Sequence, residues 1–530
     1  MQKPKSRTTP ALLDELAALF PEHEAVVDGA RRWSYGRLRQ EARDLAKGMQ
    51  RLGVGRGGRV AILMGNNAEW ISSYFAIMSL GASAVALNTW LTPRELAYQL
   101  RHAQVSLLVL EPRFRERDFL ADLATMRADG EGLPDLRQVI LVAAQAPAGM
   151  LSYGEVLTMG RSGSDASWLA AKSATQPSDV ACILYTSGST AAPKGVPLLH
   201  GGLIDNMWEI GQRMHLTPAD RLWGAVSMFW SFGCVNALFT LMTHAGTLVL
   251  QHSFEPGEAL RLIETERCTV FYGTPNVGLL LAQHPERAGR DLSSLRTGAT
   301  IGTPEQIQRL VDLGIDEICN VYGLTEAYGN SAVSDAKAPL SQRLEASGEP
   351  LSGVELRILD IATGAALPRG ELGQIALRGR LMPGYLDDAK QTAASMTADG
   401  FLLTGDLGVL DEHGWIRFRG RLKELIKSGG INVSPAEIEE VLLTHPAVEA
   451  AYVTGTPDPR LDEMVSAVIV ARAGRSVTAN ALGEHCRHAL AAYKVPRRYV
   501  FVSAGDLPLT STGKLQRNRL AGLFQTAEAG

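Results

Sequence analysis

"VACILYTSGSTAAPKG" (residues 180–195) joins an apolar run to a stretch of small polar residues that are unsuited to a core. The apolar half predicts a buried strand, and ligand-binding loops in α/β proteins leave the carboxyl ends of strands. The polar half offers backbone N–H groups and hydroxyls on a turn, with Lys194 as a nearby positive charge. Such a turn can wrap an anion, most often a phosphate. We therefore expect a phosphate loop, although this stretch taken alone also fits a solvent-exposed loop.

Two better-known phosphate motifs are excluded. The loop is not a Walker A motif, because no glycine immediately precedes Lys194 and Gly195 stands where serine or threonine should bind magnesium. "GVGRGG" (53–58) matches G-x-G-x-x-G, but a helical pattern precedes it and a strand follows it. The dinucleotide motif needs the opposite order, so we interpret this match as a helix stop and a turn.

Strands and helices alternate along the first part of the chain. The rhythm predicts parallel α/β layers. The expected strands cover 59–66, 82–88 and 105–111, and a helix covers 67–80. Thr92, Pro93 and Glu95 form a helix-starting capping box with proline at the first position, and the same signal recurs at 303–306 and 434–437. The most apolar region, 232–250, is interrupted by polar residues and predicts buried helix and strand rather than a membrane span.

The later chain has a different pattern. Glycine-rich turns and short strands over 346–384 predict a small β-rich part, and a boundary falls within 417–440. Beyond it the strands restart, with a helix near 478–493. The predicted fold class is α/β, with a large N-terminal domain (1–420) that combines layered α/β structure with a small β-barrel-like part. A smaller α+β C-terminal domain follows (421–530).

Composition limits the class of protein. The 530 residues are 45% hydrophobic and 20% charged, enough to bury a sizeable core, and the net charge of −4 gives no basic footprint for nucleic acid. The N-terminus lacks the apolar run of a secretory signal. The five cysteines are scattered without metal or redox spacing, so we expect reduced core thiols in a cytoplasmic protein without a membrane span.

Four further stretches carry chemistry-bearing residues. In "NVYGLTEAYG" (320–329), Tyr322 could stack on a base, Thr325 could bind phosphate and Glu326 could hold magnesium. In "LLTGDLG" (402–408), Asp406 suits the two hydroxyls of a ribose. "GRLKELIKSGG" (420–430) and "LPLTSTGKLQRNRL" (507–520) present basic side chains beside glycines, which allow close backbone approach or a sharp turn. Each stretch alone also fits an ordinary turn or a solvated linker; the whole ordered set is improbable by chance.

In this order and spacing, the motifs resemble those of the adenylate-forming superfamily, which includes acyl- and aryl-CoA synthetases, peptide-synthetase adenylation domains and firefly luciferase. The resemblance covers nearly the whole chain, and its last motif, P-x-T-x-x-G-K-x-x-R, is complete from Pro508 to Arg517. It implies an ATP-dependent acid–CoA ligase that forms an acyl-adenylate, releases pyrophosphate and then transfers the acyl group to the thiol of CoA. The implied small molecules are a carboxylic acid, ATP, Mg²⁺ and coenzyme A. The C-terminal domain would be a mobile lid with its hinge near Lys423.

The resemblance also assigns roles to individual residues. The implied ATP-phosphate residues are Thr186, Ser187, Gly188, Ser189, Thr190 and Lys194. The implied catalytic set is Lys514, Lys194, Thr325 and Glu326, with Glu326 as the metal ligand. Further nucleotide and CoA contacts are implied at Gly298, Ala299, Thr300, Tyr322, Gly323, Asp406, Arg421, Lys427, Gly429 and Gly430, the last two lining the pantetheine tunnel. The implied acyl pocket contains Trp230, Ser231, Phe232, Gly233, Ala299, Gly323 and Tyr328.

Departures from the family pattern bear on the substrate. Ala191 stands where the phosphate loop usually has glycine, which narrows the allowed backbone. Ser227 and Trp230 replace a usual proline and histidine, and the surrounding run resembles benzoate-type ligases. Trp230 could gate the pocket or form a flat wall for a ring, or it could simply fill the core. We expect an aromatic or compact cyclic or medium-chain acid.

Several alternatives stay open at this stage. One is a stand-alone adenylation enzyme that loads a carrier-protein phosphopantetheine instead of CoA. A luciferase-type oxygenase is another, and a nucleotide-binding protein without turnover is a third. Lys194, Glu326, Asp406 and Lys514 are all present, which argues against the third. A homodimer is also left open.

Overall fold

The computed structural model describes residues 2–128, 130–186, 193–224, 226–428, 431–458, 460–490, 492–509 and 515–526. The chain divides into two compact units. The first is Met1–Leu356 with Leu377–Leu402, and the second is Arg357–Ala376 with Leu403–Gly530. The hinge expected near Lys423 belongs to the second unit and stays a prediction.

Two large, mainly parallel sheets form the first unit. One has the order β17 (Ala332–Val333), β16 (Glu317–Tyr322), β15 (Thr297–Thr300), β14 (Val270–Tyr272), β12 (Arg221–Gly224), β13 (Thr247–Leu250), β1 (Glu24–Asp28) and β2 (Arg31–Ser34). The other has the order β11 (Lys194–Leu199), β10 (Val180–Thr186), β4 (Ser83–Ala86), β3 (Arg59–Leu63), β5 (Leu107–Leu110), β8 (Gln138–Leu141) and β9 (Leu151–Ser152). β2, β17 and β11 pair antiparallel with their neighbours. A two-stranded ribbon joins β6 (Arg113–Phe114) to β7 (Arg117–Asp118).

Side-chain alternation along these strands explains the layers. Val26 and Val27, or Leu248 and Val249, point to opposite faces and belong to different hydrophobic clusters. The central cluster fills the space between the two sheets. Its helices are α1 (Thr9–Leu19), α2 (Tyr35–Arg51), α3 (Ala68–Ser79), α6 (Tyr153–Arg161), α7 (Ala166–Ala174), α8 (His200–Arg213), η1 (Ser231–Ala237) and α9 (Leu238–Met242). The apolar run over 232–250 is therefore buried helix and strand, as predicted.

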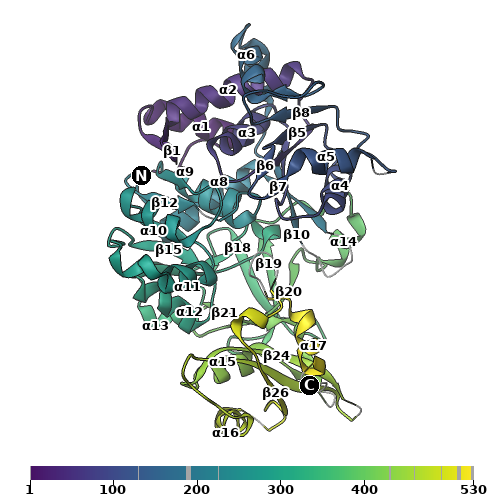
Figure 1. Cartoon of the computed structure of the whole chain (residues 1–530). Coiled ribbons are helices and arrows are strands. Elements are labelled where there is room, and N and C mark those ends of the chain that lie inside the picture. Colours follow the sequence, from purple (N-terminus) through teal and green to yellow (C-terminus); the bar gives the residue numbers. More distant parts are fainter. Residues whose placement is uncertain are drawn as a thin grey trace. The chain divides into compact units, whose positions relative to one another are not determined.

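Outer helices cover the other faces of both sheets. α10 (Pro256–Thr265), α11 (Pro275–Gln283) and α12 (Pro304–Asp312) pack on the eight-stranded sheet. α4 (Pro93–His102) and α5 (Phe119–Ala128) pack on the seven-stranded sheet. Figure 1 shows these two groups on opposite sides of the first unit. Short elements η2 (Pro285–Gly289), η3 (Thr325–Ala327), α13 (Leu340–Glu345) and α14 (Ala389–Ala394) complete it. The predicted α/β layering is thus confirmed.

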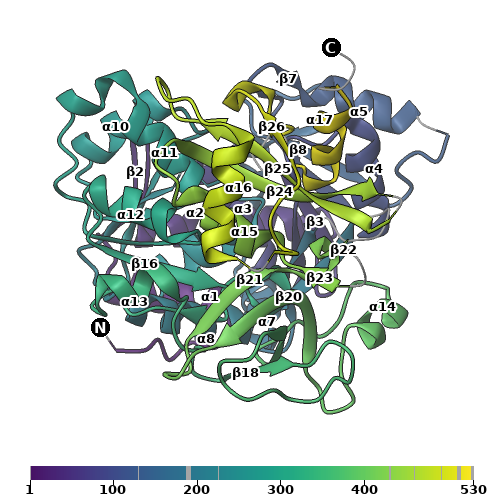
Figure 2. The same ribbon diagram turned by 90° about the horizontal axis from the view of Figure 1, so that it is seen from below.

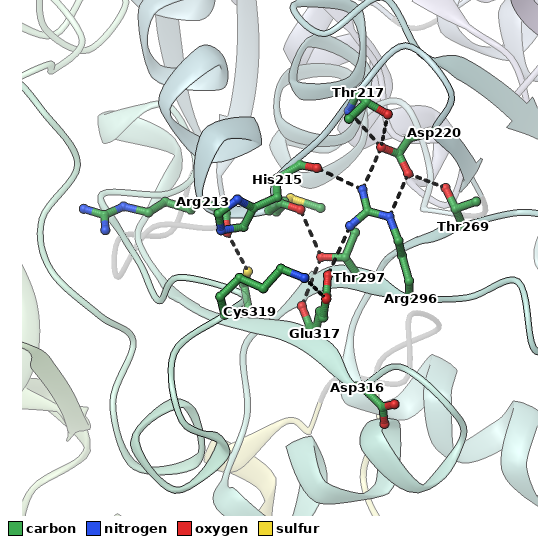
Figure 3. Close-up of polar contacts among 12 residues, drawn as sticks. Arg213, His215, Thr217, Asp220, Thr269, Arg296, Thr297, Asp316, Glu317 and Cys319 are labelled. Atoms are coloured by element: carbon green, nitrogen blue, oxygen red, sulfur yellow. Dashed lines mark hydrogen bonds and ion pairs between the residues drawn. The ribbon is translucent and has the colours of Figure 1, made fainter. Parts of the chain in front are cut away.

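A polar network ties together the amino ends of the strands of the eight-stranded sheet (Figure 3). Asp220, which is 2% exposed, accepts hydrogen bonds from the Thr217 backbone N–H at 2.8 Å and from the Thr269 hydroxyl at 2.7 Å. Arg296 pairs with Asp220 at 2.7 Å and with Glu317 at 3.1 Å. These residues precede or begin β12, β14, β15 and β16, so the network fixes the edge opposite the carboxyl ends.

The second unit contains most of a sheet with the order β18 (Val354–Leu359), β19 (Gly373–Gly379), β20 (Leu402–Leu410) and β21 (Ile416–Arg421). A five-stranded sheet combines β22 (Ile426–Ser428), β23 (Ile431–Val433), β24 (Val448–Asp458), β25 (Asp462–Ala471) and β26 (Arg498–Phe501). Figure 2 shows α15 (Pro435–Leu443) and α16 (Ala479–Ala489) beside each other over β24 and β25. The remaining helices are η4 (Leu422–Glu424), η5 (Ala504–Asp506), η6 (Arg517–Arg519) and α17 (Leu520–Thr526).

Two of the three predicted capping boxes form. The hydroxyls of Thr92 and Thr303 each accept a hydrogen bond from the backbone N–H three residues later. The side chains of Glu95 and Gln306 in turn accept from the backbone N–H groups of Thr92 and Thr303. The third was wrong in its chemistry: α15 begins after Ser434, but the Ser434 hydroxyl donates to the carbonyl of Arg419 at 2.8 Å instead. Glu437, the expected partner, pairs with Lys494 at 2.6 Å. A long-range contact therefore replaced a local one.

All five cysteines are free and buried, as expected for core thiols. None of the helices in the described part of the chain combines the length and apolarity that crossing a bilayer requires.

Candidate active site

The predicted phosphate loop connects β10 to β11. These strands pair antiparallel, and Thr186 lies directly opposite Lys194 in the register. The sequence pattern thus brings the two ends of the motif together at the carboxyl end of β10. Ser187, Gly188, Ser189 and Thr190, with Ala191, lie outside the described residues.

Lys194 and Glu326 are linked through a residue that the sequence reasoning missed. The Lys194 Nζ lies 4.9 Å from the ring centroid of Tyr385. The Tyr385 hydroxyl donates to Glu326 Oε1 at 2.9 Å. Burial raises the pKa of Tyr385, and the neighbouring carboxylate of Glu326 raises it further, so the hydroxyl keeps its proton. The cation predicted to bind phosphate and the carboxylate predicted to bind metal thereby contact the same tyrosine, one through its ring and the other through its hydroxyl.

The strand ends of β15 and β16 hold the predicted nucleotide residues. Gly298, Ala299 and Thr300 are buried in β15, and a Cβ on Gly298 would lie 2.1 Å from the Phe271 carbonyl oxygen. The buried Thr300 hydroxyl has no hydrogen-bond partner among the described residues, which is the condition a bound ligand could relieve. Tyr322 ends β16 and is 1% exposed, so stacking on adenine would require a face of its ring to open.

Four of the predicted acyl-pocket residues, Trp230, Ser231, Phe232 and Gly233, lie at the start of a π-helix, η1, a form that is frequent at functional sites. Ser231 Oγ lies 3.3 Å from Thr325 Oγ1, which joins this helix to the glutamate motif. The Phe232 ring packs edge-on against Tyr272 at 4.6 Å between centroids. Tyr272 pairs in register with Ala299. These contacts therefore link three distant segments that carry predicted residues. They join Ser231 to Thr325 directly and Phe232 to Ala299 through Tyr272.

Trp230 stands in an aromatic cluster with two rings that the sequence reasoning did not single out. Its ring meets Trp90 edge-on at 5.3 Å and Phe229 at 5.7 Å. Trp90 also meets Phe229 at 5.0 Å. Asn66 supports the preceding loop, because its side chain donates to the Val226 carbonyl at 3.1 Å and accepts from Met228 N–H at 2.9 Å. No local pattern around Trp90 marks these contacts.

Three other predicted pocket residues are packed against backbone or helix. A Cβ on Gly233 would lie 2.4 Å from the Ser227 carbonyl, and one on Gly323 would lie 2.2 Å from the Gly329 carbonyl. Tyr328 is 2% exposed, and its hydroxyl accepts a hydrogen bond from Leu199 N–H at 3.2 Å. These contacts explain why small residues stand at the first two positions. They give no support to an acyl-pocket role for Tyr328, which stays a prediction.

In the second unit, the structure brings together the predicted ribose residues. Asp406 and Arg421 face each other across β20 and β21, and Arg421 Nε lies 3.2 Å from Asp406 Oδ1. Lys423 lies in η4 and Lys427 is exposed in β22. Gly429, Gly430 and Lys514 lie outside the described residues. Leu509 and Leu515, which lie within the same motif on either side of Lys514, form an antiparallel bridge.

The donor set fits a magnesium ion that arrives with a nucleotide. Nucleotide-bound magnesium usually takes one or two protein carboxylates plus phosphate oxygens. Glu326 supplies a partly exposed carboxylate, and the Thr325 hydroxyl is adjacent. In the described residues, no group of three or more His, Cys, Asp and Glu side chains is arranged to hold a metal ion.

A lysine at the start of β11 and a glutamate motif after β16, both at strand ends of mainly parallel sheets, are typical of an α/β enzyme that uses a nucleotide. The chain belongs to the AMP-binding enzyme family: the family model matches residues 13–386, and the model of the AMP-binding enzyme C-terminal domain matches residues 437–514. Within it, the protein is an AMP-forming acid–CoA ligase, for which ATP and CoA are the substrates that the family implies.

Curated relatives and solved structures align with nearly the full chain. A 7a-methyl-1,5-dioxo-octahydro-1H-inden-4-yl-propanoyl:CoA ligase from Mycobacterium tuberculosis (strain ATCC 25618 / H37Rv) is 36% identical over 520 residues, 97% of this chain and 98% of the relative. The mitochondrial medium-chain acyl-CoA ligase ACSF2 of Danio rerio is 32% identical over 540 residues, which cover 97% of this chain and 88% of the relative. The crystal structure of the anthranilate CoA ligase AuaEII with anthranoyl-AMP has a TM-score of 0.84 at 27% identity and covers 99% of both chains.

Proposed function

We propose that this ligase activates a compact aromatic, cyclic or medium-chain carboxylic acid as its acyl-adenylate and transfers the acyl group to free CoA. The observation that carries the proposal is the line from Lys194 through Tyr385 to Glu326, beside the contact between Ser231 and Thr325. If Lys194 and Thr325 bind phosphate as proposed, these contacts would set them next to a helix that carries aromatic side chains, where an acid and the phosphates of ATP could be held together.

In the first half-reaction, a carboxylate oxygen attacks the α-phosphorus of ATP and pyrophosphate leaves. Thr186, Ser187, Gly188, Ser189, Thr190 and Lys194 would bind the phosphates, and Lys514 would offset the repulsion between the two approaching anions. Thr325 would bind phosphate and Glu326 would hold Mg²⁺, which supplies positive charge to the departing pyrophosphate. Most of the rate enhancement then comes from positioning.

In the second half-reaction, the CoA thiol attacks the acyl carbon, AMP leaves and the thiol proton is released. Asp406 and Arg421 would bind the ribose, and Gly429 and Gly430 would line the pantetheine path near Lys427. The lid would turn about Lys423 so that Lys514 and the glycines serve different half-reactions.

The proposed acid class is supported by two aromatic residues of the proposed pocket. Trp230 and Phe232 present flat, large rings, which favour an aromatic or compact apolar group over a long flexible chain. The relatives point the same way: their names specify an octahydro-indenyl propanoyl acid, a medium-chain acid and anthranilate.

The experiment that tests the proposal measures AMP and pyrophosphate release with ATP, Mg²⁺ and a panel of aryl, cyclic and linear acids, with and without CoA. Mass spectrometry follows the products. We expect an acyl-CoA from the compact acids. Thioester formation only from long linear acids would contradict the proposed acid class.

Pyrophosphate release without any thioester would favour the carrier-protein alternative. ATP binding without AMP formation across the whole panel would favour a nucleotide-binding protein without turnover. A cytoplasmic location and a homodimer stay predictions.

A further inference from the structure

The segment Met382–Leu386, here called the strap, joins the two phosphate-handling motifs. At one end, Met382 N–H donates to the Glu326 carbonyl oxygen at 2.7 Å. At the other end, Leu386 N–H donates to the Gly195 carbonyl oxygen at 2.9 Å, next to Lys194. Five residues of chain thus connect η3 to the start of β11.

The side chain in the middle of the strap repeats this connection. The Tyr385 hydroxyl donates to Glu326 Oε1 at 2.9 Å, and its ring lies 4.9 Å from Lys194 Nζ. One residue therefore constrains the carboxylate by a hydrogen bond and the ammonium by a cation–π contact. The two partners come from separate motifs. Glu326 stands 59 positions before Tyr385 in the chain, and Lys194 stands earlier still.

The position of Tyr385 is fixed from its outer side. Its backbone N–H donates to the Thr392 hydroxyl of α14 at 2.9 Å, and that hydroxyl donates to the Asp388 carbonyl at 2.8 Å. Gly384 adopts φ +147°, and a Cβ there would lie 3.0 Å from the Thr392 methyl. The backbone is therefore held so that the ring reaches inward.

An open groove of about 460 Å³ lies beside the strap and is lined by strap residues and by residues such as Arg59 and Ser83. The Tyr385 ring itself packs against the central hydrophobic cluster. Its contacts with Lys194 and Glu326 add polar constraints to this packing.

We propose that Tyr385 is a positioning residue that holds Lys194 and Glu326 in a fixed relation suited to a magnesium-bound triphosphate. The inference rests on the proposed roles of those two side chains. It predicts that losing Tyr385 weakens the binding of Mg·ATP, which needs both groups, more than the binding of AMP, which lacks the β- and γ-phosphates.

The test compares Tyr385→Phe, which keeps the ring and removes the hydrogen bond, with Tyr385→Leu, which removes both contacts. Calorimetry without any acid measures the Kd of Mg·ATP and of AMP. We expect Tyr385→Phe to raise the Kd of Mg·ATP about 5- to 30-fold, the range for one hydrogen bond to a partly exposed charged group. Tyr385→Leu should raise it further, while the Kd of AMP changes less than about threefold in Tyr385→Phe.

Tyr153→Phe is the matched control. Tyr153 in α6 is 7% exposed and its hydroxyl shares a 2.7 Å hydrogen bond with Ser72, away from the phosphate motifs. This control should leave both Kd values unchanged, whatever its effect on thermal stability. Wild-type Mg·ATP affinity in Tyr385→Phe, or an equal loss for Mg·ATP and AMP, would overturn the inference.

A double-mutant cycle separates positioning from general destabilisation. Combining Tyr385→Phe with Glu326→Gln should give less than the sum of the two losses, because Tyr385 acts through Glu326. Additive losses would contradict the proposal even if Tyr385→Leu fails to fold. A wild-type protein that binds Mg·ATP but forms no AMP with any acid would overturn the proposed function and leave this comparison valid. A wild-type protein that does not bind Mg·ATP would overturn both.

Discussion

Lys514 follows Gly513 in the last motif of the chain, and the flanking Leu509 and Leu515 pair with each other. Because this lysine would act only where carboxylate and triphosphate approach, Lys514→Ala should reduce adenylate formation by about 10²- to 10³-fold. Thioester formation from supplied acyl-AMP and CoA should change less than about twofold. Pyrophosphate release and acyl-CoA mass spectrometry measure the two steps.

Lys494→Ala is a suitable control for this change, because Lys494 lies in the same unit and pairs with Glu437 at 2.6 Å. It should leave adenylation within about twofold of the wild type, as expected for a partly exposed ion pair. Equal loss of both half-reactions in Lys514→Ala would contradict the division of roles.

Trp230 should set the size of the acid. Trp230→Ala removes a large ring from the proposed pocket, so the ratio of kcat/KM for bulkier to smaller acids should rise about 10- to 100-fold, the effect of one or two methylene-sized groups. Trp230→Phe should give a smaller shift. Trp90→Ala should shift preference the same way, because Trp90 supports Trp230 edge-on at 5.3 Å. An unchanged acid profile in Trp230→Ala would place this ring outside the pocket.

At this scale the sequence suggested residues whose chemistry is marked by a local motif, such as Lys194, Thr325 and Glu326, and their roles stay predictions. It missed Tyr385 and Trp90. Their contacts arise only when segments far apart in the chain meet, and neither "MPGYLDD" (382–388) nor "ALNTW" (86–90) carries a spacing that predicts the contact. Only the glycine before Tyr385 hinted at an unusual backbone.

At the scale of elements, the amino edge of the eight-stranded sheet depends on one buried carboxylate. Asp220→Asn would turn an amide donor toward the groups that donate to Asp220 and leave Arg296 with weaker pairing (Figure 3). We expect a loss of about 2–4 kcal/mol in the free energy of unfolding. Urea unfolding at pH 7.5 measures it.

The matched control is Glu286→Gln, because Glu286 pairs with Arg290 at 2.6 Å while its side chain is 56% exposed. Its effect on the free energy of unfolding should be much smaller than that of Asp220→Asn, because water solvates and screens an exposed ion pair. Since the network lies at the edge opposite the strand ends of the candidate site, the folded Asp220→Asn enzyme should keep its kcat. A stability equal to the wild type would show that the network is dispensable.

Element existence was predictable where short-range signals agree. The strand–helix alternation predicted β3, α3, β4, α4 and β5, because buried parallel strands are short apolar runs and Thr92 starts α4 through bonds within four residues. At Ser434 the same signal predicted the start of α15 correctly, but not the cap bond, because the hydroxyl donates to the Arg419 carbonyl instead. The local sequence predicts a capping hydrogen bond only when no acceptor from a distant segment competes for the hydroxyl of the capping residue.

At the scale of the whole molecule, the order of the motifs along the chain predicted the AMP-binding enzyme family and its division into a large and a small part. The strand order within each sheet could not be predicted. β1 and β2 join the sheet beside β13, more than 200 residues later, and no local pattern specifies such pairing.

Stability should fall as the pH drops from 6.5 toward 4.5, because two buried histidines are held neutral. Burial lowers the pKa of His200 to about 4, and its Nδ1 accepts from Thr9 N–H at 3.3 Å. Burial likewise lowers the pKa of His244 to about 4; its ring stacks on Trp208 at 4.5 Å. Above pH 6.5 neither folded nor unfolded chain binds these protons. Below it the unfolded chain binds these protons first. The free energy of unfolding therefore falls by roughly 3 kcal/mol per histidine by pH 4.

His252 works in the opposite direction, because the hydrogen bond to Glu111 raises its pKa and favours the folded state when protonated. Urea unfolding at pH 7.5, 6.5, 5.5 and 4.5 measures the balance, and the window above 4.5 keeps most carboxylates ionised. In His244→Gln, the free energy of unfolding should fall less steeply with decreasing pH than in the wild type. The difference in slope should be that of about one proton, roughly 1.4 kcal/mol per pH unit at its steepest. The same slope in wild type and variant would mean that His244 is already protonated in the fold, which its hydrogen bond from Gln212 Nε2 at 2.9 Å argues against.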